Sequence, residues 1–312
     1  MYPLKFQNIY FEKIWGGRDF QLFRSNLPQG DIGESWDVAC HPHGTSVIDN
    51  GIYKGMKLDD LLRQRGKEIL GPKINEEKFP LLVKLINSKD KLSVQVHPND
   101  EYAQRTEGES GKTEAWYVVE AFEGANLVVG TKECTKEEFA QAMRAGKLNE
   151  LLNKVDVNKG DVFFIQSGLV HAIGKGVIIA EIQENSDTTY RVFDYNRGRE
   201  LQIDKALDVI NLDLKGEKSE GVVVEENTEY RKTHFLDCEY FALDMLEIFS
   251  KCCQKGDGNS FIILTCVEGE GEIFWQNGQE KVLTGDSILI PACLQAYDLV
   301  GEMKVLTSYV PN

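Results

Sequence analysis

The chain has 312 residues, of which 42% are hydrophobic and 27% are charged, and its formal net charge is −15 at pH 7. This length allows two domains, or one large β domain with additions, and the composition is ordinary for a soluble globular protein. No apolar run approaches the ~20 residues that span a bilayer, and the N-terminus lacks the apolar core of a secretory signal. We therefore expect a cytoplasmic protein with no membrane partner.

The charge and the cysteines exclude further classes of protein. A strongly negative chain repels phosphate backbones, so no nucleic-acid partner is expected, and an anionic small substrate would need local cations to hold it. The seven cysteines are odd in number and show no CxxC spacing. This pattern argues against both a disulfide framework and a zinc knuckle.

Residues 1–56 mix short apolar runs with turn signals, which predicts short strands and loops. One turn, His41-Pro42-His43-Gly44, contains two histidines and invites comparison with a pair of metal ligands. However, the proline and the glycine predict a turn, and no carboxylate or cysteine pattern completes a site nearby. We therefore expect a surface loop at this position.

The next segments alternate between helical and strand patterns. Residues 57–70 have leucines at helical spacing and end at Gly71-Pro72, which predicts a short amphipathic helix. An apolar strand over residues 79–86 is followed by a brief turn, 87–90, and by a second strand over 92–97. The short turn predicts that these two strands form a hairpin.

The second of these strands carries polar side chains at alternate positions. Its period of two places Ser93, Gln95 and His97 on one face and three apolar residues on the other. A strand with a hydroxyl, an amide and an imidazole in one row predicts the wall of a polar pocket.

Later strands supply further polar groups. Lys112 and Glu114 alternate on one face of a strand, and His171 begins another strand after a glycine turn. Zinc suits imidazole nitrogens with a carboxylate, so His97, Glu114 and His171 form a candidate metal site, to which Gln95 could add a carbonyl oxygen. The competing interpretation is that each histidine is a core or loop residue whose ring nitrogens form ordinary hydrogen bonds and bind no metal.

Glu181 lies on the strand after His171 and shares a face with Gln183. It is a candidate general base, although a structural salt bridge explains it equally well. A lysine needs burial to become a base near neutral pH, so we expect Lys112 to act through its positive charge.

Helices and a linker are predicted in the middle of the chain. Thr135-x-x-Glu138 is a capping-box signature, and apolar residues between 148 and 155 predict a buried stripe in the helical stretch that follows it. Asp204 can cap a short helix that runs to Ile210. Residues 213–221, DLKGEKSEG, are the most linker-like part of the chain.

The C-terminal region is rich in strand patterns and contains a faint internal repeat. The segment Gly285–Ala296 lines up with Gly160–His171, and both begin with Gly-Asp followed by an apolar strand. In this alignment Ala296 stands where the first copy has His171. The second copy therefore predicts a structural barrel without a metal.

Four motifs occur in an order that is typical of one family: Gln95-Val-His97-Pro-Asn-Asp, Gly111-Lys-Thr-Glu114, Gly168-x-x-His171 and EIQENSDTTYRVFDY from Glu181. With them, and with Gly33-Glu-Ser-Trp-Asp37, the chain resembles the type I mannose-6-phosphate isomerases from about Pro3 to its C-terminus. Its length matches the short bacterial form, which lacks the large helical insertion of longer members.

The resemblance implies a mainly β fold with two cupin-type double-stranded β-helix (jelly-roll) units and a few short helices. Residues 1–212 would form an N-terminal catalytic, metal-binding cupin domain with short helical additions. Residues 213–221 would be the linker, and residues 222–312 a C-terminal, metal-free cupin-like domain.

The resemblance also implies one Zn2+ per chain and a set of site residues. The metal ligands map onto Gln95, His97, Glu114 and His171. The catalytic arginine maps onto Arg191, and the positions near the substrate map onto Ser93 and Lys112. From the strand pattern itself we add Lys112 as a catalytic residue through its charge and Glu181 as a substrate-binding residue.

The activity expected from this resemblance is zinc-dependent aldose–ketose isomerisation of mannose 6-phosphate and fructose 6-phosphate through an enediol. Arg191 would stabilise the negative charge that develops on the sugar oxygen. The expected partner is a small-molecule sugar phosphate, and the expected assembly is a monomer or a homodimer. The alternatives are another cupin metalloenzyme that acts on a sugar phosphate and a non-catalytic sugar-binding cupin.

Overall fold

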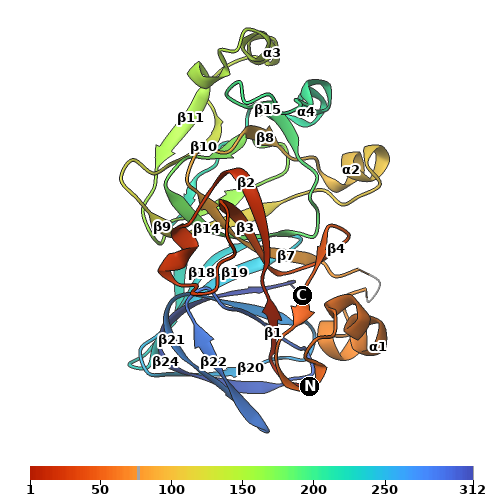
Figure 1. Ribbon diagram of the computed structural model, residues 1–312, viewed down its shortest axis with the longest axis vertical. Helices are drawn as coiled ribbons and strands as arrows, with labels where there is room; N and C mark the ends of the chain where they lie inside the picture. Colours follow the sequence, from red (N-terminus) through yellow and green to blue (C-terminus); the bar gives the residue numbers. More distant parts are fainter. Residues whose placement is uncertain (76–77, 312) are drawn as a thin grey trace.

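The computed structural model describes residues 1–75 and 78–311. Glu76, Glu77 and Asn312, which the predicted domains include, lie outside the described residues. Strands dominate the fold and form two stacked β units with short helices at their edges (Figure 1). The prediction of a mainly β protein is confirmed.

Two sheets form the N-terminal unit. The first has the strand order β16 (Lys218–Ser219), β12 (Val162–Ile165), β9 (Glu114–Ala121), β14 (Val177–Glu184), β7 (Leu81–Ser88), β3 (Ile32–Val38) and β2 (Ile9–Gly17). The second has the order β11 (Leu152–Asp156), β10 (Asn126–Thr131), β13 (His171–Ile173), β8 (Val94–Val96) and β15 (Tyr190–Phe193).

An apolar core joins the inner faces of these two sheets. Trp116 and Ile179 from the first sheet and Leu127 and Ile173 from the second belong to one buried cluster. Because side chains alternate along a strand, the residues that flank this cluster on the same faces also point between the sheets. The polar site residues take these inward positions at one end of the core.

Helices cover the other face of the second sheet. Phe139 of α3 (Lys136–Arg144) and Ala206 of α4 (Ile203–Val209) share a buried cluster with Val94 and Val96 of β8. This cluster accounts for Val94 and Val96, whereas Leu92, which was predicted on the same face, packs in the inner cluster and lines the cavity. The other helical elements of the described residues are α1 (Leu58–Leu70), α2 (Asp100–Thr106), η1 (Asp19–Leu22), η2 (Gly51–Tyr53) and η3 (Leu148–Glu150).

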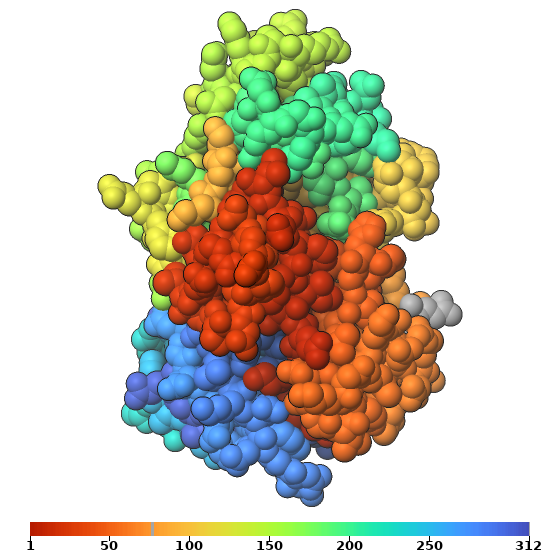
Figure 2. Space-filling model, viewed as in Figure 1, coloured from red at the N-terminus to blue at the C-terminus, as the bar shows by residue number. Residues whose placement is uncertain are grey.

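The C-terminal unit is built on one large sheet with the order β17 (Val222–Glu226), β18 (Tyr230–Asp237), β19 (Ala242–Ile248), β24 (Ala296–Tyr309), β21 (Ile262–Trp275), β23 (Ser287–Ile290), β1 (Leu4–Gln7) and β6 (Val47–Ile48). Strand β20 (Lys251–Lys255) pairs with β24, and β22 (Gly278–Leu283) pairs with β21. The N-terminal strands β1 and β6 therefore complete the C-terminal sheet. Figure 2 shows the N-terminal residues, red to orange, spread across the face between the two units.

Residues 213–221 are tied to the N-terminal unit. Strand β16 lies within this range and pairs with β12, and the Lys215 ammonium donates to the Thr131 carbonyl at 2.6 Å. The division of the chain at this linker stays a prediction. Among the described residues, no helix is long and apolar enough to cross a membrane.

The predicted hairpin between residues 79–86 and 92–97 is wrong. Strand β7 pairs with β3 and β14, whereas β8 pairs with β13 and β15 in the other sheet. Both edges of β7 are occupied by long antiparallel partners, so the short turn carries the chain from one sheet to the other. The sequence predicts the turn, but it does not show which strands pair with the two edges of β7.

Two helix predictions need correction, and two are confirmed. Helix α1 is present, and Thr135 forms the predicted capping box with Glu138 at the start of α3. However, α3 ends at Arg144, and residues 152–156 are strand β11, because they pair with β10. Asp204 lies in the first turn of α4, whose N-cap is Gln202, and caps nothing there.

The internal repeat has corresponding strands in the two units, and His171 and Ala296 each begin the strand that follows the loop. Phe163 and Ile165 face the N-terminal core, and Ile288 and Ile290 face the C-terminal core in the corresponding strand. In the next strand, Tyr297 joins this C-terminal core, whereas Ala296 is exposed. The loops before the two strands, 166–170 and 291–295, have equal length, so Ala296 keeps the sequence position of His171, but the side chain that faces the C-terminal core is that of Tyr297.

Candidate functional site

Three strands bring the predicted metal ligands together. His171 on β13 pairs with Gln95 on β8, His97 follows β8, and Glu114 begins β9 in the facing sheet. His97, Glu114 and His171 are all fully buried, and one potential ligand atom from each lies within 4.8 Å of the others. Residues that are far apart in the chain thus form one compact cluster.

Backbone carbonyls orient both imidazoles. The Nδ1 atom of His97 lies 3.0 Å from the Thr188 carbonyl, and that of His171 lies 2.9 Å from the Leu169 carbonyl. A carbonyl only accepts, so each Nδ1 carries the proton and each Nε2 keeps its lone pair. Burial, reinforced by the charge of Lys112, lowers the pKa of His97 to about 3 and also keeps His171 neutral by lowering its pKa.

The free lone pairs face Glu114. Its carboxylate lies 3.6 Å from Nε2 of His97 and 3.5 Å from Nε2 of His171, and its buried Oε1 atom has no hydrogen-bond partner. Two neutral imidazoles and a carboxylate with an unsatisfied oxygen are donors that suit a divalent metal such as zinc. The amide nitrogen of Gln95 lies 3.3 Å from Nε2 of His171. Gln95 would bind a cation only after its side-chain amide flips and presents the oxygen instead.

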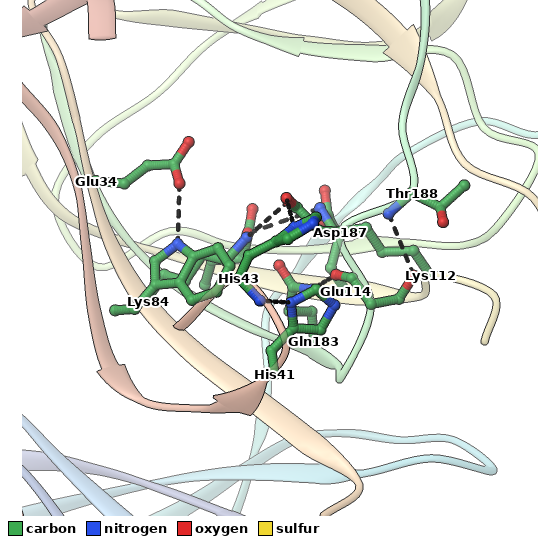
Figure 3. A network of polar contacts seen from close by, with 12 residues as sticks. Glu34, His41, His43, Lys84, Lys112, Glu114, Gln183, Asp187 and Thr188 are labelled. Carbon is green, nitrogen blue, oxygen red and sulfur yellow. Dashed lines mark hydrogen bonds and ion pairs between the residues drawn. The ribbon is translucent and has the colours of Figure 1, made fainter. Parts of the chain in front are cut away.

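Lys112 is held as a cation beside this cluster. Its ammonium lies 2.6 Å from Glu114 (Figure 3) and 3.8 Å from Glu181. Burial alone would lower the pKa of Lys112, but Glu114 and Glu181 raise it above its usual value. This agrees with an electrostatic role and disfavours Lys112 as a neutral base.

Glu181 is a buried carboxylate at the same place. Trp116 donates to it at 2.9 Å, and the ammonium of Lys84 lies 3.6 Å away. Burial and the neighbouring Glu114 raise the pKa of Glu181. A carboxylate with a raised pKa is a stronger proton acceptor than an exposed one, which supports Glu181 as a general base. The nearby ammonium of Lys84 supports the other interpretation, a structural salt bridge.

A cavity of about 340 Å³ opens in front of these groups. Ser93, Gln95, Lys112, Glu181 and Arg191, which were all predicted as site residues, line it. The metal-type cluster of His97, Glu114 and His171 lies behind this lining. The predicted site residues therefore fall in one place, and their roles stay predictions.

Arg191 reaches the cavity from β15. Its Nε donates to Ser93 Oγ at 3.2 Å, and one of its terminal nitrogens donates to the Glu200 carbonyl at 2.9 Å. Burial and the nearby Arg199 lower the pKa of Arg191. The guanidinium group of Arg191 at the cavity suits an anionic ligand, and Arg199 lies beside it, paired with the Asp194 carboxylate.

Sequence reasoning missed several residues that line the cavity: Lys13, Glu34, Lys84, Asp187 and Arg199. A local signal existed for Lys84, which interrupts the apolar run Leu81–Ile86, and Glu34 and Asp187 lie within motifs quoted above. Lys84 is 3% exposed, and its ammonium lies 4.9 Å from the Trp36 ring centre. A charge at the centre of a buried strand is costly unless it is paired, and this cost often marks a functional position.

Family models and relatives agree with this geometry. The model for the catalytic domain of type I phosphomannose isomerases matches residues 3–123, and the model for the cupin domain of mannose-6-phosphate isomerases matches residues 231–310. The mannose-6-phosphate isomerase ManA of Bacillus subtilis is 36% identical over 99% of both chains. The chain belongs to the type I phosphomannose isomerase family. The mannose-6-phosphate isomerase of Streptococcus mutans is 35% identical over 98% of both chains.

Solved structures of this phosphomannose isomerase family have the same fold. The mannose 6-phosphate isomerase from Bacillus subtilis superimposes with a TM-score of 0.92 at 31% identity over 99% of both chains. A putative mannosephosphate isomerase from Archaeoglobus fulgidus has a TM-score of 0.81 at 24% identity, which shows the shared fold. The resemblance found in the motifs thus extends over the whole chain, and the cupin prediction is confirmed.

Proposed function

We propose that this isomerase interconverts mannose 6-phosphate and fructose 6-phosphate through an enediol and needs one Zn2+ per chain. The observation that carries the proposal is the buried cluster of two neutral imidazoles and Glu114 directly behind a cavity lined by cations. The family membership of the chain supports the same substrate pair. The small-molecule sugar phosphate is the proposed partner, and the cytoplasmic location and the monomeric or dimeric assembly stay predictions.

Gln95, His97, Glu114 and His171 would hold the metal. When bound there, zinc would supply a Lewis acid that polarises sugar oxygens and so stabilises developing negative charge. The two Nδ1–carbonyl hydrogen bonds keep both Nε2 atoms available as ligands, as is usual for metal-binding histidines.

Cationic side chains would bind and orient the substrate. Arg191 and Arg199 are suited to the phosphate or to an oxyanion, because guanidinium groups form paired hydrogen bonds with such oxygens. Ser93 donates or accepts through its hydroxyl at the same wall and keeps Arg191 in place. The buried ammonium of Lys112 stabilises charge on the sugar oxygens without having to lose its proton.

Glu181 would move the proton between C1 and C2. Burial and Glu114 raise the pKa of Glu181 towards neutral pH, which makes its carboxylate a stronger base. The competing role is a salt bridge to Lys84 and Lys112, whose ammonium groups lie 3.6 and 3.8 Å away. Glu181→Gln removes the charge that both roles need, so substrate binding separates them: a lost base abolishes turnover and leaves binding, whereas a lost salt bridge to Lys84 and Lys112 also weakens binding.

A coupled assay on purified protein tests the proposal. Turnover of mannose 6-phosphate should vanish on chelation and return with Zn2+, and Glu181→Gln should lose turnover while it still binds fructose 6-phosphate. Activity that survives complete metal removal would contradict the zinc role. Absence of turnover in the metal-loaded wild type would favour a sugar-binding cupin, and turnover of another sugar phosphate alone would favour a different cupin metalloenzyme.

A further inference from the structure

The histidine-containing turn predicted at residues 41–44 contacts Asp187, which lines the cavity. It is the two-residue loop of a hairpin in which β4 (Cys40–His41) pairs with β5 (Gly44–Thr45). The turn prediction is confirmed, and the expectation of a surface loop holds for Pro42 and His43 but not for His41. The His41 side chain packs inside, since this residue is 5% exposed.

The hairpin is built so that His43 has a defined position. The ring of His41 meets the Trp36 ring edge-on with centroids 5.7 Å apart, and its Nδ1 accepts the His43 backbone N–H at 3.2 Å. The His43 ring then packs against the His41 ring at 4.9 Å. These contacts anchor the exposed imidazole on a buried tryptophan.

A second connection ties the hairpin to the segment that carries Asp187. Asn185 donates from its amide to the Cys40 carbonyl at 2.8 Å, which joins the hairpin to residues 184–188. The imidazole Nδ1 of His43 lies 3.3 Å from the Asp187 carboxylate (Figure 3). The other oxygen of that carboxylate lies 3.9 Å from the ammonium of Lys84, which lines the cavity.

We propose that His43 is a positioning residue for substrate binding, which holds Asp187 at the cavity so that its carboxylate can accept hydrogen bonds from sugar hydroxyls. His43 is absent from the cavity lining, whereas Asp187 is part of it, so His43 acts through Asp187. The Asp187 side chain is 40% exposed, and without the imidazole it gains freedom to rotate into solvent. This inference rests on the proposed sugar phosphate substrate.

The test compares His43→Ala and His43→Gln with the wild type. His43→Ala should raise KM for mannose 6-phosphate about three- to tenfold with kcat changed less than twofold, because the loss of one hydrogen bond weakens substrate binding. His43→Gln keeps an N–H donor and should restore most of the wild-type KM. His234→Ala is the matched control for His43→Ala, since it removes a histidine–carboxylate pair, to Asp244 at 2.7 Å, from the C-terminal sheet.

Binding of fructose 6-phosphate, measured by calorimetry, keeps this test independent of turnover. The effect of His43→Ala on Kd should disappear in the Asp187→Asn background, because the two residues act as one unit. An unchanged Kd in His43→Ala, or an equal loss in both backgrounds, overturns the role of His43. If the wild type binds the sugar phosphate but does not turn it over, the proposed isomerase function fails while the His43 inference is still decided by Kd.

Discussion

Replacing Glu184 by glutamine should make the protein more stable at alkaline pH. Glu184 is 5% exposed, and its carboxylate accepts the Thr113 backbone N–H at 2.7 Å. Burial and the nearby Asp100 raise its pKa from 4.5 to about 7. Glutamine fills the same space and keeps an oxygen for the Thr113 N–H, but it carries no charge that must be buried.

The size of the effect follows from linkage. A raised folded-state pKa gives stability that is present below pH 4.5 and is lost as the pH rises to about 7, because the unfolded chain releases the proton first. With about 1.4 kcal/mol per pKa unit, the cost of ionising Glu184 in the folded state reaches about 3 kcal/mol. About 2 kcal/mol of this loss falls between pH 5.5 and pH 8.

Urea unfolding of both proteins at several pH values measures this loss. The free energy of unfolding of Glu184→Gln should exceed that of the wild type by about 2 kcal/mol more at pH 8 than at pH 5.5. Glu123→Gln, at an exposed position, serves as the control and should show no such trend. A difference between Glu184→Gln and the wild type that is the same at all pH values would refute the reasoning.

Three further changes test the site and the fold. Arg191→Ala should lower kcat/KM about 100- to 1000-fold, and unchanged turnover would remove Arg191 from the mechanism. Trp116→Phe deletes a hydrogen bond that lowers the pKa of Glu181, so the acid limb of the pH–rate profile should move to higher pH; an unmoved limb would exclude Glu181 as the base. Thr135→Ala removes the capping box of α3 and should cost about 1 kcal/mol in urea unfolding, with unchanged kcat; a fall in kcat would contradict a purely structural role.

Local sequence patterns predicted the features that depend on neighbours in the chain. The alternation of Ser93, Gln95 and His97 identified a polar strand face, and the helix at 58–70 and the capping box at Thr135 followed from spacing. Their physical basis is local, because strand alternation and helix capping involve residues only a few positions apart. The prediction of a helix that continues through residues 152–156 was wrong, because these residues pair with β10 and form a strand.

The cavity residues show what local patterns cannot reveal. Lys84, Asp187 and His43 come from three distant segments and meet only because β7, the segment after β14 and the hairpin at residues 40–45 are packed together. Neither the ion pair of Lys84 with Glu181 nor the contact of His43 with Asp187 has any signature in sequence spacing. Their discovery required the tertiary structure.

By itself, the sequence determined the residue types of the site: imidazoles, a carboxylate and cations in motifs that resemble one isomerase family. The tertiary structure decided how they are used. It fixed the tautomers of His97 and His171 through backbone carbonyls, kept Lys112 charged beside Glu114, and raised the pKa of Glu181. The physical reason is that proton affinity and ligand geometry depend on burial and on charges a few ångströms away, and only the packed sheets bring those groups together.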